Sequence, residues 1–135
     1  MRKHLLIIAA VIIYLTGFSS PINAQVAGEN QLKRAQIYIE NNDFDMAVKI
    51  LEGMAKSSPN IDVYYLLGLS YRGQGNLEKA VEAFKNVLNR DNRCEPGFIQ
   101  LANVYLEMKN AKEAEKTIAQ LLRLNPKSAQ AHYAA

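Results

Sequence analysis

Cysteine and histidine are scarce in this chain of 135 residues, which has one cysteine, Cys94, and two histidines. A single cysteine excludes an intramolecular disulfide, so the fold must be stabilised by packing. The Cys94 thiol suits an intermolecular disulfide or a redox-sensitive group, but we expect it to be a small apolar residue at a helix junction. Because no His or Cys cluster has ligand spacing, the sequence predicts no metal site and no cofactor.

The residues required for nucleophilic catalysis are equally few. A hydrolase brings together a nucleophile, a base and an orienting group, whereas the only histidine beyond the first 24 residues is His132, near the C-terminus. Carboxylate pairs such as Glu113 with Glu115 stand beside lysines, which is typical of solvated helix faces. We therefore expect no enzymatic activity.

Excess charge of one sign is also missing from most of the chain. The formal net charge is +3, but Arg2 and Lys3 supply two of the 16 basic residues, so that 14 basic residues face 13 acidic ones in the remainder. The basic residues are scattered and are not interleaved with aromatic residues. The sequence therefore predicts no binding of nucleic acid.

The longest apolar run lies at the N-terminus. It extends from Leu5 to Leu15, follows Arg2 and Lys3, and is followed by small and turn-forming residues up to Ala24. This order is typical of a signal peptide at 1–24. The run is shorter than the ~20 apolar residues that cross a bilayer, so an uncleaved anchor is the weaker alternative.

We expect cleavage after Ala24 and no stable membrane insertion of the product. Because no cysteine lies near the cleavage point, a soluble exported protein, periplasmic or secreted, is favoured over a lipoprotein. Residues 25–135 are then long enough for one domain.

The chain does contain an internal repeat with a spacing of 33 to 34 residues. The three copies are Ala35, Tyr38, Ala47 and Leu51; Gly68, Tyr71, Ala80 and Phe84; and Ala102, Tyr105, Ala114 and Ile118. In every copy the two small residues are 12 positions apart. Two antiparallel helices can approach closely only where neither contributes a bulky side chain, so this spacing predicts a series of helical hairpins.

Turn-forming residues separate the apolar segments at regular intervals. Asn41 to Asp43, Gly73 to Asn76, and Lys109 with Asn110 divide each pair of helices, while Pro59 and Pro126 follow the second helices. We expect helices at about 27–41, 44–57, 61–74, 77–90, 95–108 and 111–124, a seventh beginning near Ser128, and no strands.

These residues resemble the tetratricopeptide repeat, with copies at approximately 28–60, 61–94 and 95–128 and the start of another at 129–135. The middle copy fits the family pattern best, through Tyr64, Leu67, Gly68, Tyr71, Gly75, Ala80 and Phe84. The first copy departs most, with Gln31 in place of an aromatic residue and Arg34 in place of leucine. The resemblance implies an all-α fold: a right-handed α-solenoid of about three hairpins with a truncated fourth helix.

In this family, the first helices of the pairs form a concave wall that binds short peptides or helices of other proteins. Here the residue after each small crossing position points away from the second helix, and it shares a face with residues i−4 and i+3. That face comprises Leu32, Gln36, Ile39, Tyr65, Leu69, Arg72, Ile99, Asn103 and Leu106.

The face is mostly apolar, which predicts a groove for an apolar segment of a partner protein. Tyr65 and Arg72 are expected to contribute most to binding; the alternative is that several members of the face pack between repeats. Leu32 and Gln36 occupy positions where carboxylate-clamping repeats have Lys and Asn, so a C-terminal carboxylate clamp is not expected.

Two functions fit these observations. The first is a non-catalytic, exported adaptor that binds a peptide or helix of an envelope protein in the groove. The second is an N-terminal sensor or docking fragment of a longer envelope signalling protein or peptidase. Helix 111–124 bears on this choice, because Ile118, Leu121, Leu122 and Leu124 would form an open apolar face. Truncation, self-association through this C-terminal face and cover by a partner are the three explanations.

Overall fold

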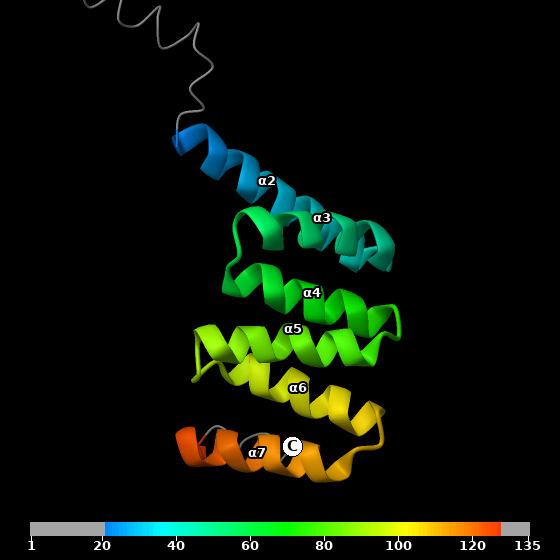
Figure 1. Ribbon diagram of the computed structural model, residues 1–135, viewed down its shortest axis with the longest axis vertical. Coiled ribbons are helices and arrows are strands. Elements are labelled where there is room, and N and C mark those ends of the chain that lie inside the picture. The colour runs from blue at the N-terminus through cyan, green and yellow to red at the C-terminus, as the bar shows by residue number, and fades with distance from the viewer. Residues whose placement is uncertain (1–20, 128–135) are drawn as a thin grey trace, which may run out of the picture. The chain divides into compact units, whose positions relative to one another are not determined.

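The computed structural model describes residues 21–127 of the chain, and within them it contains only helices (Figure 1). The six helices are α2 (Pro21–Glu40), α3 (Phe44–Ser57), α4 (Ile61–Gly73), α5 (Leu77–Arg90), α6 (Glu95–Glu107) and α7 (Ala111–Leu124). The all-helical prediction is confirmed for this part of the chain. None of these helices is both long enough and apolar enough to cross a membrane.

The predicted helix bounds agree with the structure to within one residue from residue 44 onward. The first helix differs, because it begins at Pro21 and not near residue 27, and it therefore includes Ala24. Proline is well suited to the first helical position, since its fixed φ is helical and its missing N–H has no partner there. The helix expected near Ser128 lies outside the described residues.

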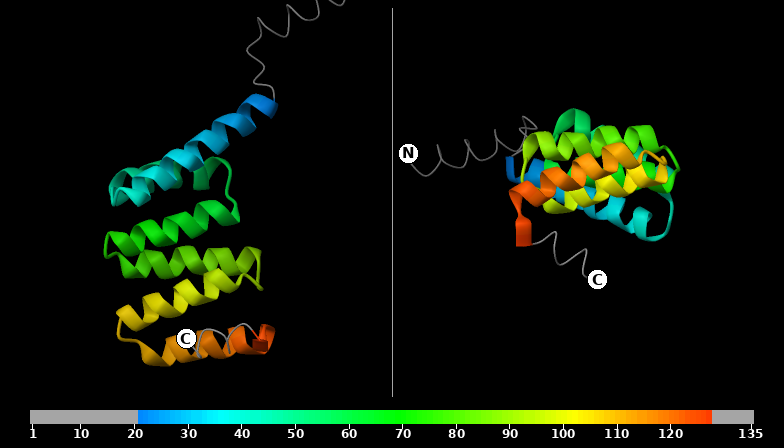
Figure 2. Two further views of the ribbon diagram at one scale, coloured as in Figure 1. Left: turned by 180° about the vertical axis from the view of Figure 1, so that it is seen from behind. Right: turned by 90° about the horizontal axis from the view of Figure 1, so that it is seen from below.

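Contacts within the chain divide it between Asn30 and Gln31, so α2 belongs partly to each unit. In the second unit, each helix from α3 to α7 packs against the next one along the chain (Figures 1 and 2). The functional surfaces described below all belong to this unit.

The three hairpin turns have the same backbone conformation. Their left-handed residues are Asn42, Gly75 and Lys109, with φ of 58°, 77° and 58°. The next residue in each turn, Asp43, Asn76 or Asn110, uses its side-chain oxygen to accept a hydrogen bond of 3.3 Å from a backbone N–H in the first turn of the second helix. These caps satisfy N–H groups that have no partner within the helix. The repeat in the sequence is thus a repeat in turn geometry.

The predicted crossing points are confirmed by the burial of their small residues. Ala35, Ala47, Ala80, Ala102 and Ala114 are all at most 3% exposed. At Gly68, an added Cβ would lie 2.5 to 2.8 Å from three ring atoms of Phe84, which is itself completely buried. The ring of Phe84 therefore occupies the space that any larger residue at 68 would need.

The junctions between hairpins differ from one another. α4 begins at Asn60, whose side chain accepts a 2.9 Å hydrogen bond from the N–H of Val63. The equivalent residue before α6 is Cys94, which makes no such bond. Its thiol is half-buried beside Gly97, in agreement with the expected place at a helix junction.

Candidate functional site

The predicted groove residues lie on α2, α4 and α6, the first helices of the three hairpins. Two of them are exposed, Gln36 and Leu106. The other seven are half-buried: Leu32, Ile39, Tyr65, Leu69, Arg72, Ile99 and Asn103. Leu106 is 53% exposed, which is unusually high for a large apolar side chain in this chain. The face is thus accessible but partly engaged in packing.

Arg72 connects two hairpins. Its Nε donates a 2.6 Å hydrogen bond to Oε1 of Glu107, its Nη1 donates a 2.8 Å hydrogen bond to Oε1 of Gln100, and its Nη2 also pairs with Glu107. Glu107 and Gln100 both belong to α6, so α4 and α6 are held side by side at this point. A ligand carboxylate that approached Arg72 would have to compete with Glu107.

Tyr65 is also engaged within the fold. Its ring meets the ring of Phe84 edge to face, with centroids 5.8 Å apart and an interplanar angle of 69°. Leu32, Ile39 and Leu69 likewise pack against the core. Packing between helices, the alternative raised by the sequence, therefore accounts for part of what these residues do.

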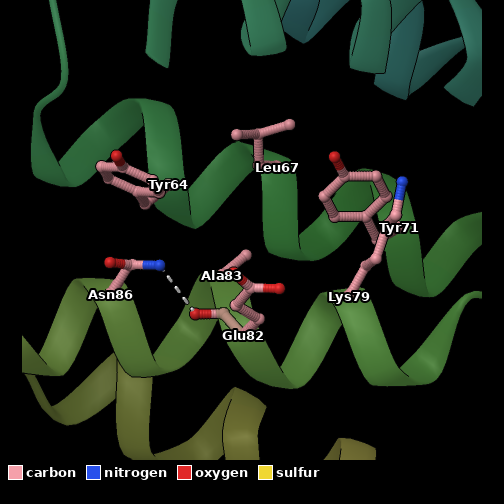
Figure 3. Close-up of a pocket in the computed structure, with 7 residues that line it drawn as sticks. All are labelled: Tyr64, Leu67, Tyr71, Lys79, Glu82, Ala83 and Asn86. Carbon is pink, nitrogen blue, oxygen red and sulfur yellow. Dashed lines mark hydrogen bonds between the residues drawn. The ribbon is translucent and has the colours of Figure 1, made fainter. Parts of the chain in front are cut away.

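A second surface, which the sequence did not indicate, lies between α4 and α5. A small cleft of about 150 Å³ is lined by Tyr64, Leu67, Tyr71, Lys79, Glu82, Ala83 and Asn86 (Figure 3). Figure 3 shows that α4 contributes both tyrosines, while Lys79 and Asn86 come from α5. The Nζ of Lys79 lies 5.2 Å from the centroid of the Tyr71 ring, and the guanidinium of Arg90 lies 4.2 Å from that of Tyr64.

Tyr71 also links this cleft to the preceding hairpin, because its hydroxyl bonds to Glu52 of α3. Burial raises the pKa of Tyr71 above its ordinary value, and the hydrogen bond to Glu52 raises it further. The contact between Tyr71 and Glu52 could not be found from the sequence. The residues are 19 positions apart and meet only because one hairpin stacks on the next.

Among residues 21–127, no group of three His, Cys, Asp or Glu side chains is placed to hold a metal ion. Lys116 and Glu113 form an ion pair on α7. The apolar, hydrogen-bonding and charged side chains described above are suited to recognition of another molecule by shape, apolar contact and charge.

Two models of the tetratricopeptide repeat match the chain, one over residues 32–93 and the other over residues 71–135. The chain contains tetratricopeptide repeats. Such repeats are scaffolds for interaction between proteins, and no catalytic family is indicated. No curated protein sequence is significantly similar to the chain.

Solved structures of MamA share the tetratricopeptide-repeat fold. "MamA 41-end from Desulfovibrio magneticus RS-1" is 23% identical with a TM-score of 0.68, and the match covers 71% of this chain and 55% of that one. "MamA RS-1 ArsTM double mutant" is 22% identical with a TM-score of 0.70, covering 75% and 57%. "MamA MSR-1 C2" is 24% identical with a TM-score of 0.64, covering 72% and 59%. This chain spans less than two thirds of the length of these neighbours, and the likeness concerns the fold.

Proposed function

We propose that this protein is a non-catalytic scaffold that binds a peptide or helix of another protein along the wall formed by α4 and α6. The observation that carries this proposal is the exposure of Leu106, at 53%, on the same wall as the half-buried Leu69 and Ile99. Large apolar side chains that remain accessible on a repeat scaffold are suited to contact with an apolar segment of a partner.

The charge on this wall indicates the character of the ligand. Arg72 is the only cation among the nine face residues, and it is already paired with Glu107. A ligand carboxylate gains little from a cation that is already neutralised. The ligand that fits best is therefore an apolar or amphipathic segment with no acidic group at its centre.

Leu106 is the best position at which to test the groove. Loss of Tyr65 or Arg72 would also remove the contact with Phe84 or the pair with Glu107, so weaker binding by those variants would have two explanations. Leu106 is mostly exposed, and Leu106→Arg should leave the helical content unchanged while it abolishes capture of the partner. Unchanged capture by this variant would place the binding surface elsewhere.

The partner can be sought with a photoreactive amino acid at position 106 in cells that produce the full chain. The matched control carries the same amino acid at Lys112, which is exposed on α7 and outside the wall. We expect proteins that crosslink from position 106 alone, and that are lost when an apolar helical peptide competes. The same set of proteins from both positions would contradict a specific groove.

The proposed place of action is the cell envelope or the exterior, and its basis is the signal-peptide pattern of residues 1–24. Mass spectrometry of the intact product from native cells tests this directly. A mass that corresponds to a chain beginning at Gln25 supports export with cleavage, whereas a product that retains Met1 or Arg2 argues against it.

A further inference from the structure

Each hairpin has a cleft at the same place in the repeat. The lining residues Leu67 and Asn86 of the middle cleft have counterparts one period away in both other clefts: Leu101 and Gln120 in one, Arg34 and Gly53 in the other. The third cleft, of about 310 Å³, is lined by Lys85, Leu88, Asn89, Leu101, Tyr105, Glu113, Lys116, Thr117 and Gln120. The first, of about 420 Å³, is lined by Gln31, Arg34, Met46, Lys49, Ile50, Gly53 and Ser57.

The first cleft departs from the other two at the residues that the family pattern would make apolar. Leu67 and Leu101 are 4% and 5% exposed, but the equivalent position in the first hairpin holds Arg34, which is exposed. Gln31 likewise replaces Tyr64 and Phe98. A leucine at 34 would fit the repeat, so this position gives up a buried apolar contact. Such local departures from a fold's own rules are expected at functional sites.

Gly53 enlarges this cleft. The equivalent residues Asn86 and Gln120 carry side chains that line the other clefts. Gly53 has no side chain, and no atom lies within 4 Å of where its Cβ would be. A glycine in a helix interior costs roughly 0.5–1 kcal/mol relative to alanine, and no close packing explains it here.

The charge of the first cleft is positive and unbalanced. Arg34 and Lys49 line it, while no acidic residue does. Among the described residues, neither cation takes part in an ion pair or a side-chain hydrogen bond. The third cleft, in contrast, pairs Lys116 with Glu113. Two uncompensated cations in one hollow repel each other, and an anion placed between them removes that repulsion.

We propose that the cleft between α2 and α3 binds an anionic group, a carboxylate or a phosphoryl group, on a peptide segment of a partner protein. The planar guanidinium of Arg34 presents paired N–H donors that match both groups, and Lys49 adds a second positive charge. Met46, which is 37% exposed, and the half-buried Ile50 provide an apolar rim. The rim favours an anionic residue flanked by an apolar one. This site is separate from the groove on α4 and α6.

Fluorescence anisotropy with the full chain tests the proposal. The probes are a short labelled peptide with two glutamates between two leucines, and its counterparts with phosphoserine or glutamine in place of glutamate. We expect the glutamate peptide, the phosphoserine peptide or both to bind more tightly than the glutamine peptide, and the stronger of the two identifies the group. Equal binding of all three peptides would overturn the proposal.

Variants locate the binding. Arg34→Gln and Lys49→Gln should each weaken binding at least about tenfold, the effect of losing one charge-assisted hydrogen bond. The matched control is Lys33→Gln, which removes the same charge at the neighbouring residue that does not line the cleft. An equal loss in Lys33→Gln would mean that only the net charge matters and would overturn the site. Leu106→Arg should not change the affinity, which separates this site from the proposed groove.

The melting temperature of Arg34→Leu tests whether the arginine has only a structural role. Because Leu67 and Leu101 are buried at the equivalent positions, we expect Arg34→Leu to melt at a higher temperature than the parent while it loses affinity for the anionic peptide. A lower melting temperature would show that Arg34 is required for packing. The presence of arginine in place of leucine would then not indicate a binding site.

Discussion

The hydroxyl of Tyr71 on α4 donates a 2.5 Å hydrogen bond to a carboxylate oxygen of Glu52 on α3. The equivalent tyrosines of the other repeats, Tyr38 and Tyr105, have no such bond among the described residues. The contact therefore distinguishes the junction between the first and second hairpins. It joins the buried side chain of Tyr71 to the half-buried side chain of Glu52, and each of these polar groups would lose a hydrogen-bond partner if the contact were removed.

Tyr71→Phe should reduce the free energy of unfolding at neutral pH by about 1–2 kcal/mol, because the Glu52 carboxylate keeps its burial and loses its donor. The pKa of Tyr71 is raised in the folded state, so the contribution of its neutral hydroxyl is complete below the unfolded pKa of about 10 and is lost as pH rises above it. Urea unfolding should therefore show a smaller difference in the free energy of unfolding between parent and variant above pH ~10 than at pH 7. A difference independent of pH would contradict the assignment.

Gly68→Ala should destabilise the protein by roughly 1–3 kcal/mol, because the new methyl group would overlap the ring of Phe84. Gly53→Ala is the matched control. There the added Cβ meets nothing within 4 Å, and the variant should gain about 0.5–1 kcal/mol from its better helix propensity. Chemical denaturation measures both. If both substitutions change the free energy of unfolding in the same direction, the effect of Gly68→Ala does not come from close packing at residue 68.

Lys109→Gly should stabilise the third hairpin by about 0.5–1 kcal/mol. Lys109 has φ of 58°, a left-handed conformation that costs a residue with a Cβ more than it costs glycine. The middle hairpin already has Gly75 at this position. The reverse change, Gly75→Lys, should destabilise by a similar amount, and thermal melting of the two variants in parallel tests the pair.

Cys94→Asn should stabilise α6 by about 1 kcal/mol, since it supplies the side-chain cap that Asn60 provides at the start of α4. Asn60→Ala should cost a comparable amount. Helical content during thermal unfolding reports both effects. A neutral Cys94→Asn variant would show that packing of the thiol beside Gly97 matters as much as the missing cap.

The helices could be predicted from the sequence because their bounds depend on residues that are close together in the chain. The residues of the turn, such as Asp43 and Asn110, are recognisable from their chemistry, and the small residues at each crossing are recognisable from their spacing. The beginning of α2 was predicted too late, because residues 21–26 show no apolar periodicity even though they form a helix.

The contacts between hairpins could not be predicted in the same way. Gly73 lies inside the predicted helix 61–74 and is the last residue of α4, but nothing in the sequence indicated that the ring of Phe44 lies where its Cβ would be. The partners of Arg72 are 28 and 35 positions away, and they follow from how α6 lies against α4. Such distances depend on the stacking of the repeats, which no single repeat encodes.

The ion pair between Arg72 and Glu107 joins the C-terminal ends of α4 and α6, and it therefore links the second hairpin to the third. An ion pair that is partly exposed weakens as salt screens it, whereas apolar packing and neutral caps do not. In a repeat array, each interface contributes separately to stability. We therefore expect the interface between the second and third hairpins to become less rigid as ionic strength rises. At high salt, an applied force should bend the array first at this interface.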